Sequence, residues 1–225
     1  MGGVVGQLLP IAVGVALSPL PIIAVVLMLV TPRGRLNGPA FILGWWVGLG
    51  VVGTIALAVA GGTKASSQGE PATWVDVVKL VLGLLLLLVA ARQWRGRPQE
   101  GATPPTPKWM GALDSFTPLK AAAAGAFFSG LNPKNLLLAV AAAATIAGAG
   151  VSTGDAVIAY LIFVLVASIG VGVPVIIAFV MGDRSDRLLD QLKTWMGQNN
   201  AVIMAVLLLV IGVKLIGDAI SGLSS

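Results

Sequence analysis

The chain carries one motif twice, LSPLPIIAV at residues 17–25 and LNPKNLLLA at residues 131–139. In each copy a small polar residue followed by proline, Pro19 or Pro133, stands inside a long apolar stretch. Proline removes a backbone donor and clashes with the preceding turn, so a helix that contains it kinks or breaks there. The repeat therefore predicts two related helices, each interrupted at its proline.

The composition around the repeat is that of a membrane protein. Of 225 residues, 57% are hydrophobic and 10% are charged, whereas soluble domains are about 45–50% apolar and about 25% charged. A helix needs about 20 mostly apolar residues to cross a bilayer. Six apolar stretches meet this need and predict an all-α integral membrane protein with six transmembrane helices, at residues 8–30, 39–61, 74–91, 121–148, 155–181 and 200–217.

Because each copy has three spans, an odd number, the two copies enter the membrane from opposite sides. This is the inverted-repeat architecture of many secondary transporters, in which paired broken helices meet near the midplane at the substrate site, and we expect the breaks at Pro19 and Pro133 to face each other. We predict a first three-helix repeat at 1–92, a cytoplasmic linker at 93–119 and a second, inverted three-helix repeat at 120–225. The first half of the linker is rich in proline, and its second half, 108–116, suits either an interfacial stretch or a solvated loop with a Trp anchor. A further break is expected at 170–174, in the fifth span, where two glycines precede a proline.

The loops differ strongly in their Lys and Arg content. The loops after spans one, three and five hold ten such residues, and the loops on the other side hold only Lys64. The ten are Arg33, Arg35, Arg92, Arg95, Arg97, Lys108, Lys120, Arg184, Arg187 and Lys193. Because basic loops stay in the cytoplasm, we predict a multi-pass protein of the cytoplasmic (inner) membrane with both termini outside the cytoplasm. No basic segment precedes the first apolar stretch, which is interpreted as a span and not as a cleaved signal.

Cysteine and histidine are absent from the sequence. Disulfides and thiolate metal sites are thereby excluded, and proton transfer would depend on carboxylates, lysines or water. We expect no metal and no cofactor, and an enzyme is the least favoured class because no catalytic constellation is recognisable. The formal charge of +5 is modest, and no nucleic-acid partner is expected.

Lys134 lies near the middle of the fourth predicted span, where a charged side chain costs at least about 2.5–3.5 kcal/mol. Two explanations stay open. In the first, its ammonium binds an anionic substrate group, helped by the positive end of a half-helix that begins at Pro133. In the second, the true span begins later than residue 121, and the side chain extends to the membrane interface. Asn132 and Asn135 flank Lys134, and Ser18 holds the matching place in the first copy. These polar side chains either bond to the backbone carbonyls that the prolines leave without a donor or contact substrate.

Other charged and small residues are expected to have structural roles. Two pairs with helix-neighbour spacing, Asp76 with Lys79 and Lys214 with Asp218, should neutralise each other near the outer interface. Asp155 is interpreted as a cap or first-turn acid of the fifth span. Close helix packing is predicted by the small residues Gly44, Gly48, Gly53, Gly170 and Gly172. Core packing is the favoured role of Trp45 and Trp46, and the alternative is that they line an apolar path.

Three ordered motifs, SPLP at 18–21, WMGALDSFTPLK at 109–120 and NPKN at 132–135, resemble the GAP family. These are the peptidoglycolipid- or sulfolipid-addressing proteins of actinobacteria, within the lysine-exporter (LysE) superfamily. The resemblance implies a cytoplasmic-membrane protein that helps move amphiphilic cell-envelope lipids outward, whereas distant relatives export amino acids and other small solutes. It implies a substrate-binding site that contains Ser18, Pro19, Pro21, Asn132, Pro133 and Lys134, to which we add the neighbouring Asn135.

The predicted function is that of a membrane transporter or exporter for an amphiphilic cell-envelope lipid or glycolipid, or for a small anionic or zwitterionic solute. An alternative is an accessory scaffold that presents lipid to a larger export complex without a transport cycle of its own. The expected partners are membrane lipid and the lipid or small-molecule substrate. A larger lipid-export complex and a homo-oligomer stay open as further partners.

Overall fold

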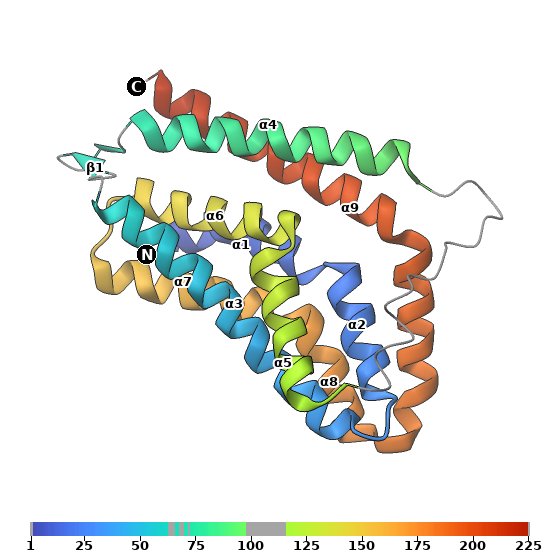
Figure 1. Cartoon of the computed structure of the whole chain (residues 1–225). Helices are drawn as coiled ribbons and strands as arrows, with labels where there is room; N and C mark the ends of the chain where they lie inside the picture. The colour runs from blue at the N-terminus through green and yellow to red at the C-terminus, as the bar shows by residue number, and fades with distance from the viewer. Residues whose placement is uncertain (1, 63–65, 68–69, 72, 98–115, 225) are drawn as a thin grey trace.

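The computed structural model describes residues 2–62, 66–67, 70–71, 73–97 and 116–224, and nearly all of them are helical. Figure 1 shows the elements, which in chain order are α1 (Gly2–Ala16), α2 (Pro19–Leu29), α3 (Gly34–Gly62), β1 (Ser66–Ser67), β2 (Glu70–Pro71), α4 (Thr73–Arg95), α5 (Pro118–Ala126), the π-helical turn η2 (Phe127–Leu131), α6 (Pro133–Gly148), α7 (Thr153–Ala167), α8 (Ile169–Met181), the 3₁₀ turn η3 (Gly182–Ser185) and α9 (Asp186–Leu223). The two short strands pair antiparallel. The expected interfacial stretch at 108–116 lies outside the described residues, apart from Phe116.

The described helices are long and apolar enough for a membrane protein. Three of them, α3, α4 and α9, can each cross a membrane by length and composition, and up to five spans result if each bent pair counts as one. The bent pairs are α1 with α2 and α7 with α8, whose axes turn by 53° and 54°. The all-helical membrane architecture is thus confirmed, whereas a sixth span, for which α6 is the shorter apolar helix, stays a prediction.

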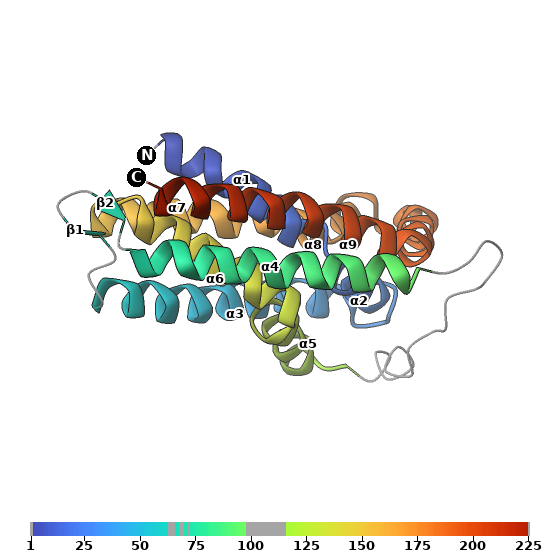
Figure 2. The same cartoon turned by 90° about the horizontal axis from the view of Figure 1, so that it is seen from above.

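Both ends of the chain lie at one end of the molecule in the two views (Figures 1 and 2). At the opposite end α2 passes into α3, and α8 passes through η3 into α9 (Figure 1). Helices α4 and α9 lie side by side over much of their length, and Figure 2 shows them crossing one face of the molecule. On the other side α3 packs against α5 and η2, α1 packs against α7, and α2 packs against α8. One apolar core joins all of these helices.

Glycines bring several of the helix backbones into direct contact. A Cβ at Gly44 of α3 would overlap the carbonyl oxygen of Ala122 in α5, and a Cβ at Gly125 of α5 would overlap that of Phe41. At Gly170 of α8 the overlap would be with the carbonyl oxygen of Ala16 at the end of α1. The predicted close packing through small residues is therefore confirmed at Gly44, Gly48, Gly53 and Gly170 and was wrong at Gly172, where a Cβ would meet no heavy atom within 4 Å. The confirmed contacts hold each broken helix against a helix of the other half.

The fifth predicted span breaks earlier than the sequence suggests. The bend lies at Ser168, whereas Pro174 lies inside α8. The Ser168 hydroxyl donates to the carbonyl of Val164 at 2.6 Å, and such a bond from serine to the carbonyl four residues earlier bends a helix. The expectation of a break at 170–174 was therefore wrong by a few residues.

The last predicted span, 200–217, is also too short, because α9 begins at Asp186. Its first turns are amphipathic: Leu189 and Met196, seven positions apart, are buried, and the polar residues between them are largely exposed. This part of α9 contacts α2. Polar residues made this stretch resemble a loop, but no proline stands between it and the apolar span, and α9 continues through Gly197.

Candidate functional site

Each of the two predicted breaks leaves one backbone carbonyl without its usual partner. Pro19 has no N–H for the carbonyl of Val15, four residues earlier, and the Ser18 hydroxyl lies 2.6 Å from that oxygen and donates to it. In the second copy the helix widens into the π-turn, where a carbonyl accepts from the N–H five residues later. For Phe128 that residue is Pro133, which has no N–H to donate. The carbonyl of Phe128 accepts instead from Nδ2 of Asn135 at 2.8 Å.

The two breaks also contact each other. Oγ of Ser18 lies 2.9 Å from Oδ1 of Asn135, although 117 positions separate them in the chain. Both side chains are buried, with Ser18 3% and Asn135 0% exposed. A serine has one hydroxyl proton, so at any moment Ser18 donates either to Asn135 or to the carbonyl of Val15.

Lys134 completes this contact. Its side chain is 7% exposed, and Nζ donates to the carbonyl oxygen of Gly14 at 2.7 Å and to Oγ of Ser18 at 2.6 Å. The sulfur of Met204 in α9 lies 3.6 Å from the same nitrogen. The ammonium thus reaches from the beginning of α6 to the end of α1, where the helix dipole favours a positive charge, and the side chain does not extend to the surface.

The positive charge of Lys134 meets only neutral groups. The ion pairs among the described residues are Lys79 with Asp76, Lys193 with Asp190 and Lys214 with Asp218, and Lys134 takes part in none of them. Its partners are a backbone oxygen, a hydroxyl and a thioether. A buried charge is costly unless it is paired, so this ammonium is an attractive partner for an anion.

The other residues predicted for the site shape the backbone. Asn132 is the N-cap of α6 and accepts the backbone N–H of Lys134 with Oδ1 at 3.1 Å. Pro19 and Pro133 are the first residues of α2 and α6, where a missing N–H costs nothing. Pro21 is buried in the first turn of α2. The structure thus brings Lys134, Ser18 and Asn135 together and places the prolines and Asn132 at the helix starts.

Sequence reasoning missed two contributors to this site. Gly14 supplies its carbonyl one turn before Ser18, a position that follows once α1 is known to end at Ala16. Met204 comes from α9, and its contact with Lys134 depends on how α9 packs. No local sequence signal marks it.

The chain matches one known family along most of its length. A family model for Sap, the sulfolipid-1-addressing protein, matches residues 8–221. The chain belongs to this family. No curated protein sequence and no solved structure matches it. The resemblance to the lipid-addressing GAP family is confirmed, and membership of the wider LysE superfamily stays a prediction.

Two apolar grooves flank α3 in this family member. One, of about 530 Å³, lies between α3 and α7 and includes Trp46 and Tyr160. The other, of about 370 Å³, lies between α3, α4 and α6 and includes Leu136 and Val140, which follow Lys134 closely in α6. Apart from Trp74, its lining side chains are aliphatic. Both grooves suit alkyl chains, and the second runs along α6, the helix whose first turn contains Lys134.

Of the two tryptophans of α3, one is in the core and the other lines the groove between α3 and α7. Trp45 is fully buried and stacks on Phe41, with ring centroids 6.3 Å apart, so its predicted core role is confirmed. Trp46 is partly exposed and donates from Nε1 to Oγ of Ser168 at 3.0 Å. The prediction of core packing was therefore wrong for Trp46, whose ring lines the groove between α3 and α7.

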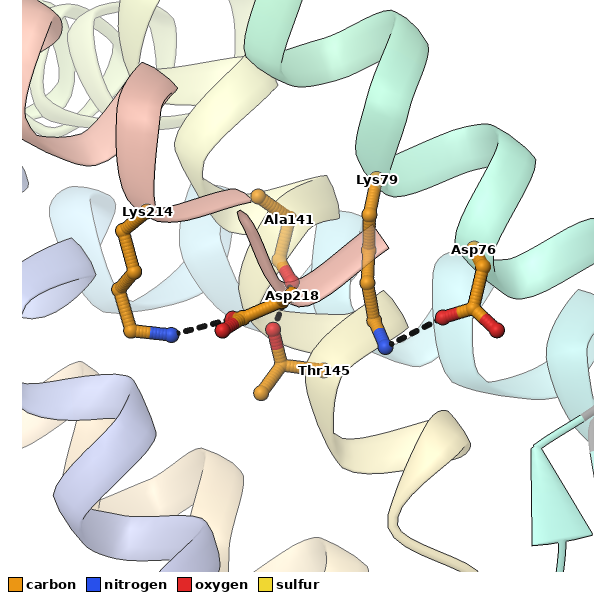
Figure 3. Close-up of polar contacts among 6 residues, drawn as sticks. All are labelled: Asp76, Lys79, Ala141, Thr145, Lys214 and Asp218. Atoms are coloured by element: carbon orange, nitrogen blue, oxygen red, sulfur yellow. Dashed lines mark hydrogen bonds and ion pairs between the residues drawn. The ribbon is translucent and has the colours of Figure 1, made fainter. Parts of the chain in front are cut away.

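Two ion pairs lie toward the end of the molecule that holds the termini, and Figure 3 shows them with Thr145 of α6. Lys79 pairs with Asp76 within α4 at 2.9 Å, and Lys214 pairs with Asp218 within α9 at 2.5 Å. The predicted neutralisation is confirmed. Asp76 is only 1% exposed, however, because it packs against Gly222 of α9.

Asp155 has a structural position at the start of α7. The backbone N–H of Asp155 donates to Oγ of Ser152, the N-cap of α7, at 3.2 Å, so Asp155 is a first-turn acid as expected. Within the part of the chain that the structure describes, no three His, Cys, Asp or Glu side chains gather where they could hold a metal ion.

Proposed function

We propose that this protein is a transporter that moves an anionic amphiphilic lipid of the cell envelope, with Lys134 binding the anionic headgroup. The observation that carries the proposal is the buried ammonium of Lys134, held by the neutral oxygens of Gly14 and Ser18 where two interrupted helices meet. Charged groups inside membrane proteins mark substrate pathways. Lipid as the substrate class is supported by the family, whose name refers to sulfolipid addressing.

The direction from which an anion would approach follows from the helix ends. Lys134 belongs to the first turn of α6, where backbone N–H groups point toward the break. The ammonium and the positive end of the α6 dipole both favour an anion there. A sulfate or carboxylate headgroup would compete with the Gly14 carbonyl and the Ser18 hydroxyl for the ammonium, so its binding would loosen the contact between the two breaks.

An inverted repeat would turn this loosening into transport. We propose six spans, with repeats at 1–92 and 120–225 joined by the linker at 93–119. Support comes from the packing, in which the second span, α3, holds α5 while the fifth, α7 with α8, holds α1 and α2. Rocking of one half against the other about the shared site is the usual route to alternating access in such folds.

We propose that the lipid chain lies in an apolar groove along α6, the helix whose first turn contains Lys134. The groove between α3, α4 and α6 is lined by apolar side chains that include Leu136 and Val140. A headgroup at Lys134 with an alkyl chain in this groove would join the polar and apolar parts of one amphiphile.

We further propose that the protein lies in the cytoplasmic membrane with both termini outside, since the ends of the chain share one end of the molecule and the basic loops lie at the other.

Reconstitution tests the proposal. Purified protein is placed in liposomes that contain a trace of fluorescent lipid with a sulfate headgroup, and movement between leaflets is followed by quenching with dithionite. We expect movement faster than in protein-free vesicles and in vesicles with Lys134→Gln protein. Movement at the protein-free rate would reject the transporter and favour the accessory scaffold, which has no transport cycle of its own.

A further inference from the structure

A polar pocket of about 240 Å³, separate from the Lys134 site, lies where α2 passes into α3 and α8 passes through η3 into α9. This is the end of the molecule opposite the termini (Figure 1). The pocket is smaller than the about 300–1,000 Å³ typical for drug-sized ligands. It therefore suits a headgroup and not a whole glycolipid, and it shares no residue with the Lys134 site.

Two opposite charges line this pocket without pairing. Arg35, in the first turn of α3, and Asp186, the first residue of α9, are both lining residues. Neither side chain forms an ion pair or hydrogen bond with the residues that the structure describes. Opposite charges that line one small pocket are complementary to a ligand that carries both signs.

A buried hydroxyl adds a third polar group. Ser185 lines the same pocket, is 2% exposed and precedes α9 as its N-cap residue. Its side chain makes no capping hydrogen bond and no other bond within the described part of the chain. A ligand that enters the pocket can therefore exchange a hydrogen bond with this hydroxyl without breaking an existing one.

Apolar side chains share the remaining lining with Thr31. They include Leu29 and Val30 from the end of α2 and Ala178 and Phe179 from α8. Such walls favour a ligand whose polar group continues into hydrocarbon. A soluble zwitterion offers no such continuation, whereas a membrane lipid does.

We propose that this pocket binds the headgroup of a zwitterionic phospholipid with a primary amine, phosphatidylethanolamine. The planar guanidinium of Arg35 matches the phosphate, and the carboxylate of Asp186 accepts N–H bonds from the ammonium. A quaternary ammonium has no N–H to donate, so phosphatidylcholine fits less well. A purely anionic headgroup would leave Asp186 without a partner and would meet its like charge.

Binding to the purified full chain tests this site. Short-chain phosphatidylethanolamine, phosphatidylcholine and phosphatidylglycerol are titrated separately into protein in detergent, and bound lipid is counted by native mass spectrometry. We expect phosphatidylethanolamine to bind about tenfold more tightly than the other two, because each lacks one charge-assisted hydrogen bond or an ionic partner. Asp186→Asn, which loses the acceptor for the ammonium, should remove this tenfold preference. Arg35→Gln, which loses the partner of the phosphate that all three lipids carry, should weaken the binding of each by about tenfold.

Matched controls lie beside both residues. Arg33→Gln changes an exposed arginine of the same loop, and Asp190→Asn changes an exposed carboxylate one turn further along α9, and neither residue lines the pocket. Both should bind like the wild type, as should Lys134→Gln, which separates this site from the transport site. Thermal melting of each variant shows that it is folded.

Three results would overturn the proposal. One is equal binding of the three lipids, and another is an equal loss in the control variants. The third is binding of free O-phosphoethanolamine as tight as that of the lipid, which would show that the apolar walls and the acyl chains contribute nothing.

Discussion

Lys134 donates a hydrogen bond to the hydroxyl of Ser18 across 2.6 Å and 116 positions of sequence. The two residues occupy neighbouring places in the two copies of one motif, so the bond joins the break of the first copy to the break of the second. Any motion that separates the two breaks must exchange this bond for another. A substrate anion at Lys134 would provide that exchange, which is why we treat this contact as the centre of the proposed transport cycle.

Ser18→Ala should destabilise the folded protein by about 1–3 kcal/mol, the usual cost of leaving buried partners unsatisfied. The substitution removes an acceptor from Lys134 and a donor from the carbonyl of Val15. Thermal unfolding in detergent measures the effect. Ser224→Ala, which removes an exposed hydroxyl bonded to the carbonyl of Ile220, is the control and should melt like the wild type. Equal melting of both variants would show that the Ser18 bonds are dispensable.

Much of this site was predictable because prolines act locally. Pro19 and Pro133 each remove one backbone donor, and the residues that replace it, Ser18 and Asn135, stand within two positions of the proline. The repeat of the motif added the expectation that the two breaks meet. The π-turn before Pro133 was not predictable, since it differs from an α-turn only by one residue of register, and neither was the contact of Met204, which depends on the packing of α9.

Gly44→Ala should lower stability by about 1–3 kcal/mol, the range of overpacking substitutions in a close-packed core. A Cβ at this position overlaps the carbonyl oxygen of Ala122, and a backbone atom cannot move aside as a flexible side chain can. Gly50→Ala on the same helix has no heavy atom within 4 Å of its new methyl group. It should be neutral or stabilising by about 0.5–1 kcal/mol, as alanine is a better helix former. Similar melting temperatures for the two variants would contradict the packing of α3 on α5.

Val140→Trp should slow the transport of long-chain lipid by filling the groove between α3, α4 and α6. Leu161→Trp adds the same ring to the groove between α3 and α7 and should leave transport unchanged. Leaflet exchange of a fluorescent lipid in liposomes, normalised to reconstituted protein, compares the two. A larger loss with Leu161→Trp would move the proposed chain-binding groove to the other side of α3.

Single cysteines test the proposed orientation without background, because the chain has none of its own. Cysteines that replace Gly3 and Ser224 should react with a membrane-impermeant maleimide in intact cells, and one that replaces the exposed Arg33 should react only after permeabilisation. The physical reason is that the basic loops are retained in the cytoplasm. Reaction of the Arg33 cysteine alone in intact cells would invert the topology.

The decisive prediction concerns Lys134, which either binds the substrate or only holds the two breaks together. Lys134→Met removes the charge and every donor, so the carbonyl of Gly14 loses its partner and both stability and transport should fall. Lys134→Gln retains a neutral donor and should recover stability, yet transport of an anionic lipid should stay at least about tenfold below wild type because the charge is gone. Lys134→Arg keeps the charge on a wider planar group and should transport at a reduced rate. Lys120→Gln, at an exposed lysine of α5, is the control and should behave as wild type. Melting temperature and leaflet exchange, measured on the same preparations, separate the two roles: if Lys134→Gln restores transport together with stability, the ammonium is a structural bridge and not the substrate anchor.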